Sequence, residues 1–438
     1  MVECLPDHGK RVPPEQRCGP LSQAIGGSAI RTRRRRTHAD GPTQGKRLLV
    51  VANPFPPMTS AGTNRVLRLL RHLPAQGWEA TVLTAEAQGP DTTPDFVRVL
   101  RTPVLVPRPL LRGGRRSSKV NAWLFVPDPY VLWAATAIAA GRRLLAAEPF
   151  DAIFSSHPRA SVHVTAAGLA RASGVPWMAD YRDRRFANDV RTYATPLHAA
   201  ATRWLETRVL RHAAAVSAIN QPILDAIVKH HPRLEGHAHV LPNGYDGTET
   251  ATAAELGPGF WFVYTGRLYE REQPLEAFLT ALAALPQDVK VLFVGDATRV
   301  QPLAAKLGVG DRVRVERLVP HSVALGYQRA ADALLLMTGR RAESMSSKVF
   351  EYLHAGRPVF AITAPHSAAS KLLAEVGGGF TVQHDADMRE PLARFVADVR
   401  SGAGPVADAD ALARYDMAGV TAELATVLDG LAARGRPR

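Results

Sequence analysis

The sequence predicts an α/β protein built from two doubly wound domains that face a central cleft. The chain has 438 residues, which corresponds to about two domains of ordinary size. Short apolar runs alternate with longer amphipathic segments, a pattern typical of parallel sheets covered by helices on both faces. The same alternation starts again at residue 259, after a polar, glycine-rich segment without periodicity. These three observations predict two similar α/β units in tandem.

The composition is that of a globular protein with sizeable cores, since 46% of the residues are hydrophobic and 21% are charged. Cys4 and Cys18 are the only cysteines, which excludes a disulfide framework or a cysteine metal site. The longest apolar stretches, residues 130–141 and 331–337, are shorter than the ~20 residues of a membrane-spanning helix. The N-terminus lacks the order of a secretory signal. We therefore expect a cytoplasmic protein.

The formal charge of +14 is unevenly distributed, because residues 1–47 hold ten Lys or Arg and four acids. Residues 1–45 are predicted to be a disordered basic leader, and "RTRRRR" at 31–36 is its densest run. Such a run could touch an anionic bilayer or nucleic acid, and it could equally be a solvated tail. Nucleic acid is not the expected partner, because no zinc-finger, RNP or helix-turn-helix signature accompanies the charge.

The first domain is predicted over residues 46–242. Residues 47–54 form a β-branched run that ends at Asn-Pro, residues 64–77 have helical spacing and end at Gly, and residues 79–85 resume as a strand. This βαβ unit is followed by strands at 150–156 and 176–181, separated by the helix "ASVHVTAAGLARASG". A further helix, "RWLETRVLRHA", leads into the strand "AAVSAIN".

Residues 243–258 are predicted to link the domains, because they are polar and rich in glycine. The second domain is expected over residues 259–412, with strands at "FWFVYTG", "VKVLFVGD", "RVRVERLV" and "ADALLLMT". Residues 413–438 read as an amphipathic helix, which we expect to pack back on the first domain.

Doubly wound domains bind ligands at the carboxyl ends of their strands. The loop after the first strand, "NPFPPMTSAGTNR", contains a single glycine, Gly62. A G-x-G-x-x-G fingerprint is absent there, which disfavours a nicotinamide dehydrogenase, and the Gly-Lys-Ser/Thr pattern of a P-loop is absent as well.

Six segments, taken in order, carry a resemblance: "PFPPMTSAGTNRVLRLLRHLPAQGWEATVLTA", "SSHP", "VPWMADYRD", "VLPNGYD", "YTGRLYERE" and "ESMSSKVFEYLHAGRPVF". Together they resemble glycosyltransferase family 4, over nearly all of residues 46–432. The most specific element is the E-x7-E pattern of Glu343 and Glu351, followed by "KVFEYLHAGRP". The resemblance implies a GT-B fold and a retaining hexosyltransferase. It implies a nucleotide-sugar donor held by the second domain, an acceptor held by the first, and no cofactor or metal.

The segment that follows the first glutamate is predicted to begin a short helix. Ser346 or Ser347 can cap this helix, and Gly356 with Pro358 ends it. The free N–H groups at its start could bind the donor diphosphate, and Lys348 in the first turn would add positive charge.

The two glutamates and a neighbouring loop complete the expected donor site. As in the family, Glu343 would accept hydrogen bonds from sugar hydroxyls, and Glu351 would bind the two ribose hydroxyls, because each carboxylate oxygen can accept one O–H. The loop "TGRLYERE" supplies Arg267, a predicted catalytic cation, and Arg271 as a second contact. Glu272 stands where the family more often has Lys, and an exposed loop arginine is the alternative for Arg271.

The first domain offers candidate acceptor residues at its strand ends. Gly62 would let the backbone approach a ligand, and His157 occupies a position where related enzymes contact the sugar. The step "DYRD" adds Asp180, Arg182 and Asp183, which echoes a subgroup that acts on bacterial surface polysaccharides. The alternatives are a turn glycine, a core or capping histidine, and an Asp–Arg pair that braces the loop.

Two other functions fit the same pattern. A nucleotide-sugar epimerase shares the two-domain shape but uses no acceptor, and a non-catalytic sugar-nucleotide binding protein would depend on its leader. We expect a glycan, lipid-linked or small-molecule acceptor. We also expect peripheral contact with the inner face of the cell membrane, through the basic segment "RPLLRGGRRSSK". The donor base and sugar are not encoded in any motif.

Overall fold

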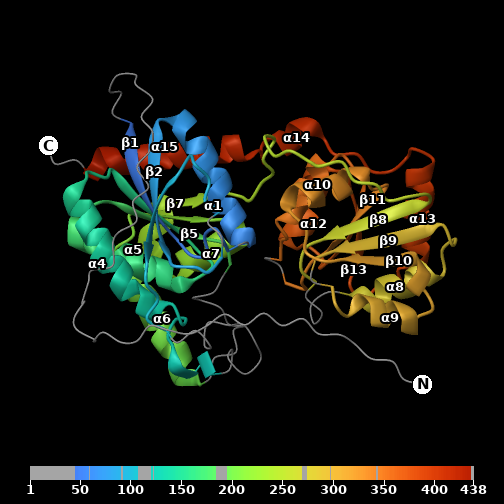
Figure 1. The fold of residues 1–438 in the computed structure, drawn as a ribbon, viewed down its shortest axis with the longest axis horizontal. Helices are drawn as coiled ribbons and strands as arrows, with labels where there is room; N and C mark the ends of the chain where they lie inside the picture. The colour runs from blue at the N-terminus through green and yellow to red at the C-terminus, as the bar shows by residue number, and fades with distance from the viewer. Residues whose placement is uncertain are drawn as a thin grey trace, which may run out of the picture.

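The computed structural model describes residues 45–58, 60–89, 92–106, 120–121, 123–183, 195–268, 274–295, 297–341 and 344–435. The predicted leader lies outside the described residues except for residue 45, and so does the whole basic segment at 108–119. The described chain forms two lobes, each a parallel sheet covered by helices (Figure 1). The predicted α/β fold of two doubly wound units is therefore confirmed.

Seven parallel strands form the N-terminal sheet, in the order β3-β2-β1-β4-β5-β6-β7. They are β1 (Lys46–Ala52), β2 (Trp78–Ala85), β3 (Arg98–Thr102), β4 (Ala152–Ser156), β5 (Trp177–Tyr181), β6 (Ala215–Ala218) and β7 (Ala238–Val240). The helices are α1 (Ala61–His72), α4 (Val131–Ala147), α5 (Ala160–Ser173), α6 (Pro196–Leu210) and α7 (Gln221–His230), with short 3-10 turns at Leu73–Gln76 and Pro232–His237.

Strand β1 is buried on both faces, which explains its uninterrupted apolar run. Leu49 and Val51 join the core beneath α4 and α5, whereas Leu48 and Val50 join the opposite core with α1. Because successive side chains of a strand point to opposite faces, a strand between two helical layers needs apolar residues at every position.

Six parallel strands form the C-terminal sheet, in the order β10-β9-β8-β11-β12-β13. They are β8 (Phe260–Thr265), β9 (Val289–Val294), β10 (Val313–Glu316), β11 (Ala333–Met337), β12 (Val359–Thr363) and β13 (Gly379–Gln383). The helices are α8 (Leu275–Ala283), α9 (Val300–Lys306), α10 (His321–Ala330), α11 (Lys348–His354), α12 (Ala368–Val376), α13 (Arg389–Arg400) and α14 (Ala409–Ala413), and a 3-10 turn lies at Gly310–Arg312.

The chain crosses between the lobes twice, and the two crossings lie side by side. Tyr245 N–H donates to the carbonyl of Tyr415 at 3.1 Å, and Met417 N–H donates to the carbonyl of Tyr245 at 2.9 Å. Gly244 is required here, because a Cβ atom at this position would overlap the Tyr415 carbonyl. The hinge therefore consists of two paired segments.

The second crossing leads into α15 (Met417–Gly435), the long red helix that returns to the N-terminal lobe in Figure 1. Its apolar face packs in the same core as α1, through Val420, Leu424, Leu428 and Leu431. Among the described residues, no helix is both long and apolar enough to cross a membrane.

Candidate functional site

Four of the predicted acceptor-side residues lie together at the carboxyl edge of the N-terminal sheet. His157 follows β4 directly, and its Nδ1 lies 3.3 Å from Oδ1 of Asp183, which follows β5. Gly62 lies in the first turn of α1, where a Cβ atom would overlap the guanidinium of Arg182 and approach Pro158 Cδ to 3.1 Å. The glycine therefore allows the loops after β4 and β5 to close over the start of α1.

Helix α1 begins where the sequence predicts an N-terminal cap. Ser60 has extended backbone, and its Oγ accepts a hydrogen bond from Thr63 N–H at 3.1 Å. This cap fixes the end of the proline-rich loop against the strand edge.

A layer of aromatic rings supports His157 from below. The ring of His157 stacks on those of His163 and Tyr181, with centroids 5.7 and 6.0 Å away. Burial and the neighbouring His157 lower the pKa of His163 well below its usual value, so this imidazole is neutral. Ser155 Oγ accepts from the indole of Trp177 at 2.7 Å and lies 2.8 Å from His163 Nδ1.

The carboxylate of Asp180, another predicted acceptor residue, is fully buried. Arg65 donates from Nε and Nη2 to its two oxygens at 3.1 and 2.9 Å. Ser156 and Ser217 each add a hydroxyl hydrogen bond, at 2.7 and 2.9 Å. These four bonds give Asp180 an internal structural role, joining α1 to the ends of three strands.

On the opposite lobe, Lys348 reaches beneath the loop that follows β8. Its Nζ lies 3.9 Å from the centre of the Tyr264 ring, and a Cβ atom on Gly266, whose φ is +97°, would lie 2.8 Å from Lys348 Cε. Burial lowers the pKa of Lys348 to about 7, although the charge of Glu351 opposes the shift. An anion bound at this loop would favour the protonated form of Lys348. The anion would bind more tightly to this ammonium group than to a neutral amine.

The remaining predicted donor residues lie around this lysine. Arg267 follows Gly266 and is exposed, and its carbonyl accepts from the Tyr264 hydroxyl at 2.8 Å. Ser346 and Ser347 are half-buried just before α11. The predicted side-chain cap is wrong: Ser347 occupies the cap position, but its backbone is already helical, at φ −59° and ψ −18°, and its side chain makes no capping bond. Glu343 and Arg271 lie outside the described residues.

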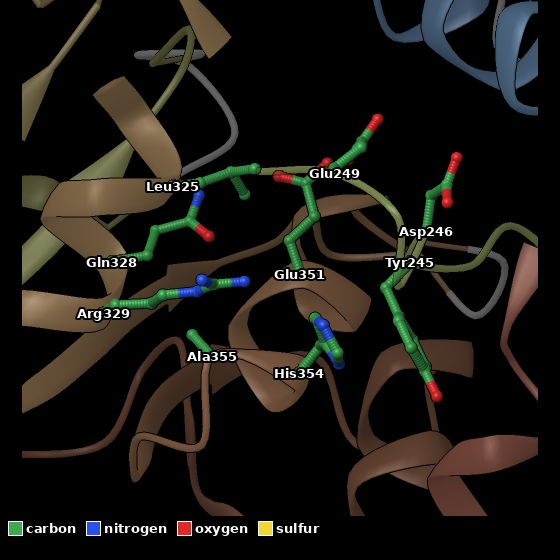
Figure 2. A pocket seen from close by; sticks show the side chains of 9 residues that line it. All are labelled: Tyr245, Asp246, Glu249, Leu325, Gln328, Arg329, Glu351, His354 and Ala355. Carbon is green, nitrogen blue, oxygen red and sulfur yellow. The ribbon is translucent and has the colours of Figure 1, made fainter. Parts of the chain in front are cut away.

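Glu351, the second glutamate of the E-x7-E pattern, lies in the first turn of α11 and points toward Glu249 of the linker (Figure 2). Arg68 of α1 donates from Nη2 to Glu351 Oε1 at 2.7 Å. The same guanidinium binds Glu249 through Nε and Nη2, at 3.0 and 2.7 Å. His321 Nε2 lies 3.1 Å from Glu249 Oε2 and 3.9 Å from Glu351 Oε1. Two lobes and the linker therefore meet at one carboxylate.

Figure 2 shows the pocket beside this carboxylate, which is lined by Tyr245, Asp246, Glu249, Leu325, Gln328, Arg329, Glu351, His354 and Ala355. The rings of Tyr245 and His354 stack at 4.2 Å along one side. Every lining residue comes from the linker, from α10, or from α11 and the residue that follows it.

Glu249, His321 and Glu351 also form a potential metal-ligand set, since one ligand atom of each lies within 4.8 Å of the others. The sequence did not predict this cluster. Arg68 Nη2 lies 2.7 Å from one oxygen of each carboxylate and already supplies the positive charge. A metal ion would have to displace the guanidinium, so these residues do not fit one.

Sequence reasoning missed Arg68, Glu249 and His321. A signal for the first was present, because Arg65, Arg68 and Arg71 recur at every third position of a predicted helix and so share one face. The sequence contained no indication of which acids these arginines meet.

Two family models match the chain. Residues 60–244 match the glycosyl transferase 4-like domain, and residues 259–398 match the glycosyl transferases group 1. A search of curated protein sequences found no significant match.

Solved structures share the fold at low sequence identity. Sucrose-phosphate synthase from Thermosynechococcus elongatus is 15% identical, with a TM-score of 0.60 over 89% of this chain and 97% of its own. Anabaena Alr3699/HepE in complex with UDP and glucose is 18% identical, with a TM-score of 0.63 over 88% and 100%. A putative UDP-N-acetylglucosamine 2-epimerase from Listeria monocytogenes is 10% identical, with a TM-score of 0.51 over 86% and 94%.

Proposed function

Because this chain belongs to the glycosyltransferases, we propose that it transfers a sugar from a nucleotide-diphosphate sugar to an acceptor with retention of anomeric configuration. The observation that carries the proposal is the position of two residues on α11. Lys348 lies beneath the β8 loop, and Glu351 follows one turn further along the same helix. A cation for a diphosphate and a carboxylate for a ribose diol are thus presented by one short segment. Anabaena Alr3699/HepE, which shares the fold, has been solved with UDP and glucose.

The proposed donor site uses the charges of the C-terminal lobe. Arg267, at the carboxyl end of β8, and Lys348 would face the diphosphate, together with Ser346 and Ser347. Negative charge accumulates on this diphosphate as the glycosidic bond breaks, so fixed cations lower the barrier. Glu351 would bind the ribose. Two predicted contacts, Glu343 to the sugar and Arg271 to the phosphates, extend the proposal beyond the described residues.

In the proposed reaction, the bond between the anomeric carbon and the diphosphate oxygen breaks, and the acceptor oxygen bonds to that carbon on the same face. The acceptor proton passes to the departing phosphate oxygen, so no covalent glycosyl-enzyme forms. His157, at the end of β4, would contact the transferred sugar, and Arg182 and Asp183 would orient the acceptor beside Gly62. Asp180 supports these loops from within.

We further propose that the acceptor is lipid-linked or part of a surface glycan, and that the N-terminal lobe contacts an anionic bilayer. On α6, Leu197 and Trp204 are 76% and 62% exposed and lie seven residues apart, on one face. Trp123 is 60% exposed, and its ring packs edge-on against His198 of α6 at 5.6 Å. Indole side chains favour the interface between water and lipid.

The same helix carries the charge that an anionic surface would attract. Arg203, Arg208 and Arg211 are exposed, and Arg208 lies 5.4 Å from the centre of the Trp204 ring. Because β5 and β6 are parallel, α6 begins at the sheet edge where β5 ends, which is also the edge that carries Asp183. A lipid-borne acceptor held by this surface would therefore lie next to the proposed acceptor residues.

The transfer is tested by incubating the protein with UDP-, GDP-, dTDP- and ADP-sugars and extracted lipid-linked acceptors. Products are analysed by mass spectrometry, and the new linkage by NMR. We expect the acceptor mass to increase by one hexose-type unit, with the donor's anomeric configuration kept. Epimerised sugar formed without any acceptor would identify an epimerase instead, and inversion would exclude the retaining mechanism.

The membrane contact is tested by sedimentation with phosphatidylglycerol or phosphatidylcholine vesicles at low salt. Wild type should bind the anionic vesicles more tightly, at about 1 kcal/mol per surface Lys or Arg, and lose this preference as salt is added. Leu197→Ser should weaken binding, whereas Leu318→Ser is the matched control, because Leu318 is 78% exposed on the other lobe. Equal binding to both vesicle types, or equal effects of the two variants, would exclude this surface.

A further inference from the structure

Three arginines on one face of α1 bind the linker that joins the lobes. Arg65 donates to the carbonyls of Leu241 and Pro242, at 2.8 and 2.7 Å. Arg68 donates to the carbonyl of Gly244 at 2.9 Å, and Arg71 pairs with Asp246. The spacing of three residues aligns these side chains along the helix, so residues 241–246, where the first domain passes into the linker, are held by one helix of the N-terminal lobe.

Arg68 is the member of this set that also crosses to the C-terminal lobe, where it binds Glu351. Its side chain is 5% exposed and that of Glu351 is 12% exposed, so the contact is largely shielded from water. The described contacts of Arg65 and Arg71 include no residue of α11.

We propose that Arg68 is a positioning residue that holds the Glu351 carboxylate in the orientation that binds the ribose of the donor, so that nucleotide affinity depends on a residue of the opposite lobe. This inference rests on the proposed ribose role of Glu351. It adds that the site is complete only when both lobes contribute.

The hydrogen-bonding capacity of a carboxylate makes this arrangement possible. Its two oxygens offer about four acceptor positions, and Arg68 Nη2 takes one of them, on Oε1. Positions remain for both hydroxyls of a vicinal diol, so the arginine and the ribose can be bound together. If the ribose had to displace Arg68 from Glu351, the arginine would weaken nucleotide binding, and replacing it would then tighten binding.

The guanidinium is itself held rigidly, because Glu249 binds it through two nitrogens and Gly244 through the third. A lysine at this position could not make the same set of bonds, since a single ammonium replaces a planar group with five N–H donors. The position of Glu351 Oε1 is therefore set by α1 and the linker.

A thermodynamic consequence follows from this bridge between the lobes. If the lobe arrangement that forms the Arg68–Glu351 bond improves ribose binding, then ribose binding stabilises the same arrangement, because coupling between two equilibria is reciprocal. Nucleotide affinity and closure of the lobes are linked through this contact.

The test measures ribose recognition directly by calorimetry. UDP, GDP, ADP and dTDP are compared, and the tightest binder is measured beside its 2′,3′-dideoxy form. Wild type should prefer the hydroxylated nucleotide by about tenfold or more, the range of hydrogen bonds to a charged group. Arg68→Lys and Arg68→Met should reduce this preference to about threefold or less, with the fold verified by circular dichroism. The lysine variant keeps a cation between the two carboxylates if the methionine variant fails to fold.

Arg71→Met is the matched control, because Arg71 lies on the same helix face and binds the same linker without contacting Glu351. It should keep the wild-type preference. Glu351→Gln distinguishes the ribose-binding role of Glu351 from the positioning role of Arg68. If it lowers the preference while Arg68→Lys leaves it unchanged or tightens binding, the positioning role is wrong and the ribose role stands. If Glu351→Gln keeps the wild-type preference, both are wrong.

Discussion

Arg65 and Arg68 lie one turn apart on α1, yet their ion pairs differ in almost every property. Arg65 and Asp180 are 2% and 0% exposed, and the carboxylate is saturated by hydrogen bonds from three side chains. Arg68 binds two carboxylates, and Glu351 and Glu249 remain 12% and 15% exposed. The first pair stays within one lobe, whereas the second joins two.

A buried carboxylate can be structural or ligand-binding, according to the acceptor positions that its existing hydrogen bonds leave open. Burial raises the pKa of Asp180, but Arg65 and the two serines outweigh it and keep the pKa below its ordinary value. Burial opposes ionisation of Glu249 too, and hydrogen bonds from His321 and Arg68 lower its pKa to about 2. Both acids are therefore ionised at neutral pH.

The largest expected effect is the loss of stability when the buried Arg65–Asp180 pair is broken. Asp180→Asn leaves the Arg65 charge buried and uncompensated, which should lower the free energy of unfolding by about 3–5 kcal/mol. Urea denaturation followed by tryptophan fluorescence measures this loss. Arg340→Ala, which breaks an ion pair with Asp385 that is exposed on both sides, is the control and should cost under about 1 kcal/mol. Equal losses would remove the distinction between the two kinds of pair.

The next largest effect concerns Arg267, at the carboxyl end of β8. Arg267→Ala should lower kcat by on the order of 10²-fold while the protein stays folded, because the arginine would stabilise charge that develops on the leaving diphosphate. Steady-state kinetics with varied donor measure the change, and circular dichroism verifies the fold. A folded variant with wild-type kcat would exclude Arg267 from the proposed mechanism.

Glu206 of α6 is a third buried acid, and its carboxyl has no ion pair or hydrogen bond among the described contacts. Burial raises its pKa to about 8, so the carboxyl is neutral at pH 7 in the fold and ionised in the unfolded chain. Folding must therefore take up a proton above the unfolded pKa near 4.3, and the cost grows until pH 8.

Glu206→Gln should accordingly stabilise the protein by about 1–3 kcal/mol at pH 7 and change little at pH 4. Thermal denaturation at both values of pH measures the difference. An equal effect at pH 4 and pH 7 would show that packing, and not ionisation, separates the two side chains.

The smallest effect concerns His321, which lies beside the carboxylates that bind Arg68. Burial lowers its pKa, but the hydrogen bond to Glu249 and the charges of Glu351 and Glu249 outweigh burial and the repulsion from Arg68, so the net shift is upward. Its stabilising contribution is complete below the unfolded pKa of about 6.5 and is lost as pH rises through the higher folded value.

Wild type should therefore lose stability relative to His321→Gln as the pH rises from about 6 to 8, by less than about 1 kcal/mol, because the imidazole is 37% exposed and partly screened. Chemical denaturation across this range measures the trend. The opposite slope would mean that His321 is neutral in the fold.

Much of the fold was predictable because its signals are local. Uninterrupted apolar runs such as that of β1 require burial on both faces, and the helical spacing of Val420, Leu424, Leu428 and Leu431 predicts one packing face. The sequence also placed His157, Arg182 and Asp183 at strand ends and Gly62 in the loop after the first strand, and the structure brings these four residues together. The cap at Ser347 was wrong, because residue preference does not determine backbone angles.

The sequence by itself determined the two α/β units, the arginine spacing of α1 and the segment that carries Lys348 and Glu351, since each depends on residues a few positions apart. Only the tertiary structure decided which acid each arginine meets. Asp180 lies 115 positions from Arg65 and Glu351 lies 283 positions from Arg68, and a helix face fixes the direction of a side chain but not the partner that the folded chain brings to it. Strand order and lobe packing choose that partner, and with it the difference between a carboxylate that supports the fold and one that can receive a ligand.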